Sequence, residues 1–310
     1  MGGVQGSCCR TCKDRGTTAF AFVDSIGITG AVRGLRHHSC EYADGATYEG
    51  EWLDEMRHGH GEQVWPDGAR YTGEWDTDMA HGIGKFEHCN GDTYHGQMHK
   101  DKAHGHGVYR GINGLRYDGQ WHEDRRHGSA TETWATGAIF RGEYNDGKRH
   151  GQGEFSWPDG SVYIGNFSED CIQGEGIYSW SDGRRYAGQW RDSRMHGVGT
   201  FTWRDGRKYQ GRYKDDQKEG QGTFLWPNGR RYEGQWRGGC MEGRGELWPA
   251  EGGQPRRGLW KAGLQVLDKQ KDSADDELQR SNSILCCCSS AQQQHNVVVK
   301  SVKEEPMSVD

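Results

Sequence analysis

A strictly periodic repeat constrains the fold of this chain more than any other feature. An aromatic residue, a glycine and a second large residue occupy alternate positions, as in Tyr71, Gly73 and Trp75. The leading aromatic residues recur at one constant interval and are Tyr48, Tyr71, Tyr94, Tyr117, Phe140, Tyr163, Tyr186, Tyr209 and Tyr232. A strict period over nine copies predicts one supersecondary unit stacked on itself, which is a solenoid.

Each copy has the pattern of two short strands. The aromatic residue, the glycine and the second aromatic residue lie on one face of an extended chain because they alternate. A polar connection of five or six residues is expected next, for example residues 53–58. The second strand carries Gly82, Gly84 and Phe86 at alternate positions. An Asp-Gly or Asn-Gly pair then ends the copy, and such a pair is a strong hairpin signal. The sequence therefore predicts an all-β, elongated solenoid of antiparallel hairpins.

The combination of glycine and large aromatic residues has a steric reason. The chain has 50 glycines and 13 tryptophans in 310 residues, and its mean hydropathy of -1.03 argues against a large globular core. Side chains directly opposite on neighbouring strands are only ~5 Å apart, so a face made solely of rings would be overfilled. A glycine opposite a ring allows that ring to lie over bare backbone.

The Tyr-x-Gly-x-Trp strand, the His-Gly-x-Gly strand and the 23-residue step resemble MORN repeats. On this resemblance, nine copies occupy residues 46–249, and a degraded tenth contains Gly258, Leu259 and Trp260. The resemblance implies an elongated antiparallel β-hairpin solenoid. It also implies a scaffold or adaptor without catalytic activity, because the chain outside the repeats is too short for the kinase or methyltransferase domains that accompany such repeats elsewhere.

Several copies depart from the pattern. Met98 replaces the second aromatic residue, Gln63 and Glu132 replace the aromatic residue of the second strand, and Ala130 replaces a glycine. The fourth copy, around residues 127–137, is therefore the candidate for a bend or a partner contact. Neutral drift in a tolerant repeat is the alternative.

Composition changes at both ends of the repeats. We expect an acylation-type N-terminal tail at residues 1–24, a degenerate capping repeat at 25–45, repeats at 46–260 and a disordered tail at 261–310. Residues 41–260 carry 28 Lys and Arg against 35 Asp and Glu, which gives no support to nucleic-acid binding. The scattered cysteines do not form a disulfide framework, and no signal peptide is recognised, so we expect a chain on the cytosolic side of a membrane.

The N-terminal residues resemble a substrate for N-myristoylation at Gly2 that is followed by palmitoylated cysteines. The candidate cysteines are Cys8, Cys9 and Cys12 near the N-terminus and Cys286, Cys287 and Cys288 in the C-terminal tail. One myristoyl chain binds a bilayer only marginally, so the cysteines would supply the second membrane signal. Ordinary unmodified tails are the alternative for both clusters.

One pattern of positive charge recurs in register. It consists of Arg184, Arg185, Arg207, Lys208, Arg230 and Arg231. Stacking of the repeats would align these residues as a basic stripe that binds phosphoinositide headgroups or another anionic ligand. The alternative is that these side chains pair with neighbouring carboxylates such as Asp182, Asp205 and Glu233.

Histidine also recurs at one repeat position, at His58, His81, His104, His127, His150 and His196. Neighbouring rungs of this ladder would be ~10 Å apart, because two strand spacings separate them. That separation is too wide for two rungs to share one metal ion. The sequence therefore predicts no metal site within the ladder and no cofactor, and a zinc bridge between two chains through His and Cys of an end repeat is the alternative. It contains no recognisable catalytic motif.

These observations favour a scaffold at the cytosolic face of the plasma membrane or at the cell cortex. We expect unidentified protein partners, membrane association through acylation, and a homodimer formed through exposed strand edges or the ends of the array. The alternatives are a soluble structural subunit of a ciliary or cytoskeletal assembly and a regulatory partner of a phosphatidylinositol phosphate kinase.

Overall fold

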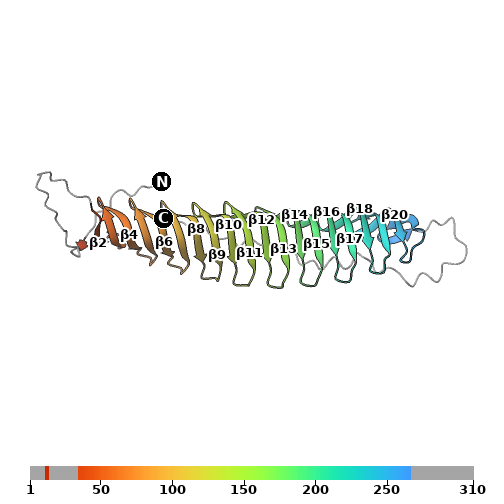
Figure 1. Cartoon of the computed structure of the whole chain (residues 1–310), viewed down its shortest axis with the longest axis horizontal. Helices are drawn as coiled ribbons and strands as arrows, with labels where there is room; N and C mark the ends of the chain where they lie inside the picture. The colour runs from red at the N-terminus through yellow and green to blue at the C-terminus, as the bar shows by residue number, and fades with distance from the viewer. Residues whose placement is uncertain (1–10, 14–33, 267–310) are drawn as a thin grey trace, which may run out of the picture. The chain divides into compact units, whose positions relative to one another are not determined.

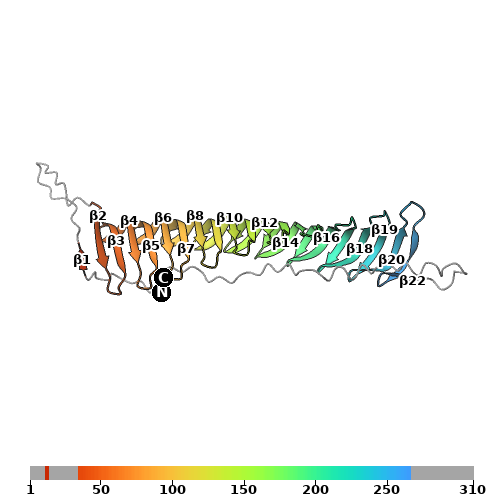
Figure 2. The same cartoon turned by 90° about the horizontal axis from the view of Figure 1, so that it is seen from below.

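The computed structural model describes residues 11–13 and 34–266, and every regular element in these ranges is a β-strand. The described chain forms two compact units, the first ending at Gly147 and the second beginning at Lys148. Within each unit, strands that follow one another in sequence pair antiparallel, as Figures 1 and 2 show. The predicted all-β fold of antiparallel hairpins is confirmed.

The strands of the two units follow one repeating plan of seven and nine residues, apart from the ends of the array. The first unit contains β1 (Thr11–Lys13), β2 (Arg36–Glu41), β3 (Thr47–Leu53), β4 (Met56–Val64), β5 (Arg70–Asp76), β6 (Met79–Glu87), β7 (Thr93–His99), β8 (Lys102–Arg110), β9 (Arg116–His122), β10 (Arg125–Thr133) and β11 (Ile139–Asn145). The second unit contains β12 (Lys148–Ser156), β13 (Val162–Ser168), β14 (Cys171–Ser179), β15 (Arg185–Arg191), β16 (Arg194–Thr202), β17 (Lys208–Lys214), β18 (Gln217–Leu225), β19 (Arg231–Arg237), β20 (Cys240–Trp248), β21 (Arg256–Lys261) and β22 (Leu264–Val266).

The connection inside each repeat is shorter than the sequence predicted. Between β5 and β6 only Thr77 and Asp78 form the turn, and Asp76 already pairs with Met79. Both turn residues have positive φ, 51° and 66°. Two left-handed residues in a two-residue turn match the twist of the flanking strands. The predicted connection of five or six residues was wrong, because Leu53 belongs to the first strand of its repeat and residues 56–58 belong to the second.

The Asp-Gly pairs form the other connection, between one repeat and the next. In the turn before β5, Trp65 N donates to Ala69 O at 2.9 Å and Gly68 N donates to Trp65 O at 2.9 Å. Asp67 Oδ1 accepts from Ala69 N, and Gly68 has a φ of 91° that favours glycine. The predicted hairpin signal therefore marks the connection between repeats, which is longer than the two-residue turn inside each repeat.

The second strand of each repeat contains a bulge that its glycine pattern does not show. The β5–β6 register shifts after Gly73 pairs with Gly84, and Gly82 has a φ of 59°. A residue that lacks a Cβ permits this backbone at the bulge. The carboxylate of Glu74 accepts a hydrogen bond from Ile83 N at 3.0 Å, beside the shifted residues. Simple alternation through Gly82, Gly84 and Phe86 was therefore wrong, although Gly84 and Phe86 follow it.

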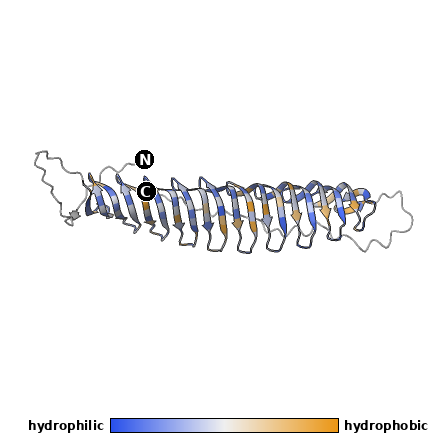
Figure 3. Ribbon diagram, viewed as in Figure 1, coloured by the Kyte–Doolittle hydropathy of each residue, from blue (hydrophilic) through white to orange (hydrophobic). Residues whose placement is uncertain are grey.

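The core of each unit is a row of tyrosine rings over glycine backbone. A Cβ at Gly84 would lie 2.3 Å from the Tyr71 hydroxyl, so that position requires glycine. Tyr71 packs edge-on against Trp75 with ring centroids 5.1 Å apart, a favourable aromatic arrangement. The Tyr71 hydroxyl donates to Glu74 O at 3.0 Å, and Trp75 Nε1 donates to Gly61 O at 3.2 Å. Figure 3 shows apolar and polar residues interspersed along the strands.

The departures from the aromatic pattern are accommodated inside this core. Met98 is buried in the place of a ring. Gln63 accepts a hydrogen bond from the Arg57 guanidinium at 3.1 Å. Glu132 is 2% exposed, and Arg126 Nη1 lies 2.7 Å from its carboxylate. Tyr144 donates a further hydrogen bond to that carboxylate. The fourth repeat, which contains Glu132, keeps the strand pairing and bulge of the other repeats.

The ends of the described array differ from the inner repeats. β2 pairs with β3 in the manner of a second repeat strand. β21 and β22 form a hairpin around Ala262 and Gly263, which carries strand pairing past the expected end of the repeats at residue 260. Cys40 and Cys240 each take part in a disulfide bond, whereas the sequence indicated no disulfide framework.

Candidate binding surfaces

The turn arginines of the predicted basic stripe lie on tryptophan rings. The guanidinium of Arg184 lies 5.2 Å from the ring centre of Trp180, and that of Arg207 lies 5.5 Å from the ring centre of Trp203. Arg230 stacks on Trp226 at 5.0 Å. Each arginine precedes a strand, directly after its Asp-Gly or Asn-Gly pair. The second unit therefore carries a ladder of arginine–tryptophan stacks along its turns.

Carboxylates neutralise part of this ladder. Arg184 Nε is 2.7 Å from Asp182, and Arg207 Nε is 2.7 Å from Asp205. The turn of Arg230 carries Asn228 instead, whose side-chain oxygen accepts from the Arg230 backbone N–H at 3.1 Å. The pairing that the sequence left open as an alternative is thus present at Arg184 and Arg207, while the Arg230 turn carries an amide in its place.

The other three members of the stripe lie on strands. Arg185 and Lys208 are exposed, and both pair in register with Thr202. Arg231 ion-pairs with Glu233 at 2.9 Å and lies 4.5 Å above the ring of Trp248. The six residues are in register as predicted, but they form two rows with different partners.

In the first unit, two further histidines lie beside the predicted histidine ladder. His99 and His122 lie between the rungs of the predicted ladder, because they occupy the ends of the intervening strands β7 and β9. Ring centroids are 5.1 Å apart for His81 and His99, and 5.7 Å apart for His99 and His104. The next two separations, through His122 to His127, are again 5.1 and 5.7 Å. The sequence prediction concerned only the spacing between rungs, and it did not consider the imidazoles of His99 and His122.

A sequence signal for this row existed. His99 and His122 are themselves separated by one full repeat, so they share one repeat position, but that position holds histidine in two copies only. We name His81, His99, His104, His122 and His127 the histidine row. Loss of water around His99, together with the charges of His81, Lys100 and His104, lowers its pKa below the ordinary value.

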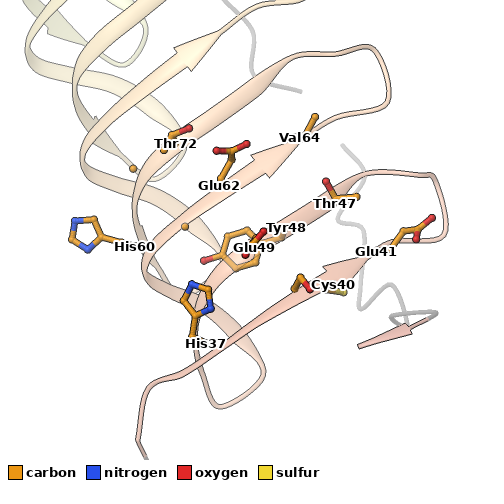
Figure 4. A pocket seen from close by; sticks show the side chains of 13 residues that line it. His37, Cys40, Glu41, Thr47, Tyr48, Glu49, His60, Glu62, Val64 and Thr72 are labelled. Atoms are coloured by element: carbon orange, nitrogen blue, oxygen red, sulfur yellow. The ribbon is translucent and has the colours of Figure 1, made fainter. Parts of the chain in front are cut away.

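A wide depression of about 680 Å³ lies at the start of the first unit. Figure 4 shows His37 and His60 near one end of it and Glu41 at the other, with Glu49 and Glu62 along the lining. In residues 11–13 and 34–266, no three His, Cys, Asp or Glu side chains are arranged to hold one metal ion. The depression is therefore a polar surface feature with no preformed metal centre.

The second unit exposes a patch of apolar side chains on its solvent face. Ile164 pairs in register with Ile177, and Ile177 pairs with Ala187 on the next strand. Val198 lies on the following strand. Ile164 is 51% exposed and Val198 is 56% exposed. We name these four residues the apolar patch, and the sequence analysis did not identify it because apolar residues occur at these repeat positions in only a few copies.

The predicted lipidation residues fall outside the described structure, with one partial exception. Gly2, Cys8, Cys9, Cys286, Cys287 and Cys288 lie outside the described residues. Cys12 belongs to β1, of which only the backbone is described. No helix that could span a bilayer occurs among the described residues.

Solved structures with a related arrangement have very different sequences. The TCP10 domain of Danio rerio CPAP, in complex with a peptide of Danio rerio STIL, is 13% identical with a TM-score of 0.38, and the match covers 66% of this chain and 97% of that chain. The TCP domain of Drosophila melanogaster SAS-4, in complex with a proline-rich motif of Ana2, is 13% identical with a TM-score of 0.29, covering 58% and 85%. At these TM-scores the likeness carries no argument about function.

The family comparison is decisive. No curated protein matches the chain. The MORN repeat model matches residues 48–70, 71–93, 94–116, 117–139, 140–162, 163–184, 186–206, 209–230 and 232–251. These repeats indicate a non-catalytic repeat protein. With nine consecutive matches over more than half of its length, the chain belongs to the MORN repeat family.

Proposed function

We propose that this chain is a scaffold that binds protein partners through the solvent face of its hairpins and is held at the cytosolic face of a membrane by acylation. The apolar patch carries the protein-binding part of this proposal. Ile164 and Val198 each expose more than half of their surface to water, and Ile177 and Ala187 are partly exposed on the two strands between them. Contiguous exposed apolar side chains with polar surroundings are typical of protein-binding sites.

The surroundings of the apolar patch favour a protein ligand. The patch crosses β13, β14, β15 and β16, which are held in fixed register by their backbone ladders. Thr200, which pairs with Ala187, and Arg212, which pairs with Val198, supply polar groups at its border. A rigid apolar centre with a polar border loses little conformational freedom when a partner covers it.

The protein-binding proposal is tested by affinity purification of the full-length chain from cells. The double variant Ile164→Glu/Val198→Glu places charges in the apolar patch. The matched control is Ile83→Glu, since Ile83 is 48% exposed and pairs with the polar Gln97. We expect a set of proteins that the wild type and the control retain and the double variant loses. Identical protein sets from all three baits would contradict the proposal.

Membrane attachment is the second part of the proposal. Support comes from Gly2 and the adjoining Cys8 and Cys9, whose pattern resembles a dual acylation signal. We expect Gly2→Ala and Cys8→Ser/Cys9→Ser to move the chain from the membrane to the soluble fraction. An unchanged distribution of both variants would favour the soluble ciliary or cytoskeletal alternative.

Anionic lipid is a third expected ligand, through the cations of the basic stripe that lack a carboxylate partner in the described structure. Arg185, Lys208 and Arg230 meet this description. We expect Arg185→Glu/Lys208→Glu/Arg230→Glu to reduce binding to vesicles that contain phosphoinositide, and to leave binding to neutral vesicles unchanged. Equal binding of wild type and variant would limit lipid contact to the acyl chains.

A homodimer is the last part of the proposal. Light scattering measures the oligomeric state in solution, and a monomer mass would contradict the expected homodimer.

A further inference from the structure

We propose that the histidine row binds divalent transition-metal ions such as Zn²⁺, each ion being held by two imidazoles from neighbouring strands. This property is separate from the scaffold function, because it concerns the first unit and requires neither the apolar patch nor acylation. Neutral imidazole is a common ligand for Zn²⁺, Cu²⁺ and Ni²⁺.

The separation of the rings fits two imidazoles on one ion. A Zn–N distance of about 2.05 Å places each ring centre ~3.2 Å from the metal, so a tetrahedral angle gives centroids ~5.2 Å apart. The observed separations in the histidine row are 5.1, 5.7, 5.1 and 5.7 Å. Ring planes are inclined by 49° to 61°, so the rings are not stacked face to face. The proposal requires that rotation about the side-chain bonds aim one nitrogen of each ring at the same point.

The backbone holds these side chains in place. His99 and His122 end β7 and β9, directly before two-residue turns, and His104 lies on β8 between them. The register of β7 with β8, and of β8 with β9, is fixed by paired strands. His99 and His122 are exposed, so an ion reaches them without opening the fold.

Two depressions along the histidine row provide space for bound ions. One of about 460 Å³ is lined by His81, His99, His104 and Glu123, together with the side chain of Gln97. Another of about 390 Å³ is lined by His104, His122 and His127. His104 borders both depressions. The Gln97 side-chain oxygen already accepts a hydrogen bond from His106 N at 2.8 Å, so the imidazoles are the principal ligands.

The charges beside the histidine row set limits on affinity. Lys102 lies 3.3 Å from Glu123, so that carboxylate is shared with a cation. Because no three donors in the described chain are arranged around one point, water would complete the coordination of each ion. Affinity is therefore expected to be weaker than that of a four-ligand structural site.

The test is a calorimetric titration of the full-length protein with ZnCl₂ at neutral pH. His99→Gln/His122→Gln removes every close ring contact of the histidine row, since each contact involves one of these two residues. The matched control is His150→Gln/His196→Gln, which removes two histidines of the second unit at the repeat position of His81, His104 and His127. All three proteins keep the same cysteines, so zinc held by thiolates is equal among them. Circular dichroism checks that all three remain folded.

We expect the wild type and the control to bind Zn²⁺ equally. His99→Gln/His122→Gln is expected to lose at least one bound ion per chain or at least tenfold in affinity. In NMR spectra of the wild type, the imidazole resonances of the histidine row should shift when Zn²⁺ is added. Identical isotherms for wild type and His99→Gln/His122→Gln would overturn the proposal, and so would an equal loss in the control.

Discussion

The two units share one backbone plan but place different chemistry on it. Both contain two-residue turns, bulges at glycine and buried tyrosines over glycine backbone. At the edge where the first unit has its histidine row, the second unit has cations and carboxylates, namely Arg191, Lys214, Glu219, Arg237 and Glu242, besides His150, Ser168, Gln173 and His196. The contact between tyrosine and glycine is therefore the fixed part of the repeat, and the edge positions are free to carry function.

The same contrast extends to the interior and the turns. Gln63 and Glu132 occupy positions of the first unit that Phe155, Phe201 and Phe224 occupy in the second. The turn arginines of the second unit correspond in the first unit to four buried apolar residues and one carboxylate, which are Ala46, Ala69, Leu115, Ala138 and Asp92. In these two copies of the first unit the polar side chain pairs with an arginine, whereas the buried polar residues of the second unit, Arg149, Ser161 and Lys218, lie at other repeat positions.

The largest expected effect comes from breaking the buried polar pair of the first unit. Glu132→Ala leaves Arg126 with a guanidinium whose carboxylate partner is gone, in surroundings where Glu132 is 2% exposed. Such a loss costs about 3–5 kcal/mol of unfolding free energy. Denaturant unfolding followed by circular dichroism measures this value. Glu132→Gln reproduces the arginine–glutamine pair seen at Arg57 and Gln63, so its loss of unfolding free energy should be smaller than that of Glu132→Ala. Equal losses of unfolding free energy in the two variants would show that the pair of Arg126 and Glu132 is not the cause of the destabilisation.

Glycines beneath tyrosines should be equally sensitive in both units. A Cβ at Gly84 would lie 2.3 Å from the Tyr71 hydroxyl, and one at Gly199 would lie 2.3 Å from that of Tyr186. We expect Gly84→Ala and Gly199→Ala each to destabilise by about 1–3 kcal/mol through overpacking. Thermal and denaturant unfolding measure the loss of stability in each variant. A clear difference between Gly84→Ala and Gly199→Ala would contradict a shared core.

Alkaline pH should destabilise the fold through its buried tyrosines. Burial raises the pKa of Tyr178 to about 12. An unfolded tyrosine titrates near 10, so the unfolded state loses its proton first and stability falls as pH rises above 10. Below pH 10 this contribution is fully present. At pH 11 the expected loss is about 1 kcal/mol for this residue.

Tyr178→Phe provides the control for the pH prediction, because phenylalanine has no hydroxyl to titrate. The stability of Tyr178→Phe relative to wild type should increase by about 1 kcal/mol between pH 8 and pH 11. Unfolding measured at both pH values tests this difference. A constant difference would indicate that the hydroxyl of Tyr178 titrates normally.

The smallest effect is expected at the turn arginines. Arg207→Ala introduces the residue that Ala46 and Ala69 supply in the first unit. It removes an exposed ring contact and an ion pair with Asp205, for an expected loss of about 0.5–1 kcal/mol. Arg230→Ala should cost less, since Asn228 replaces the aspartate. Thermal melts that rank the two variants in the opposite order would contradict the role given to Asp205.

Sequence patterns predicted the elements of each repeat better than their connections. Tyr71, Gly73 and Trp75 share a face because side chains alternate along any extended strand. The connection was predicted too long because Thr77 and Asp78 give no strong turn signal, although both adopt positive φ. The candidate site was predicted in part, since the positions of Arg184 and Arg207 were in register but their carboxylate partners were only one of two alternatives.

The sequence by itself determined the period, the hairpin and the buried face, because a repeat that alternates rings with glycine has one arrangement that fits both sterically. Tertiary structure decided which side chains meet at the edges. The bulge at Gly82 and its equivalents shifts the register within each second strand, and neighbouring strands then interleave His99 between His81 and His104. Such contacts depend on the position of one strand relative to the next, which the spacing of residues along the chain does not specify.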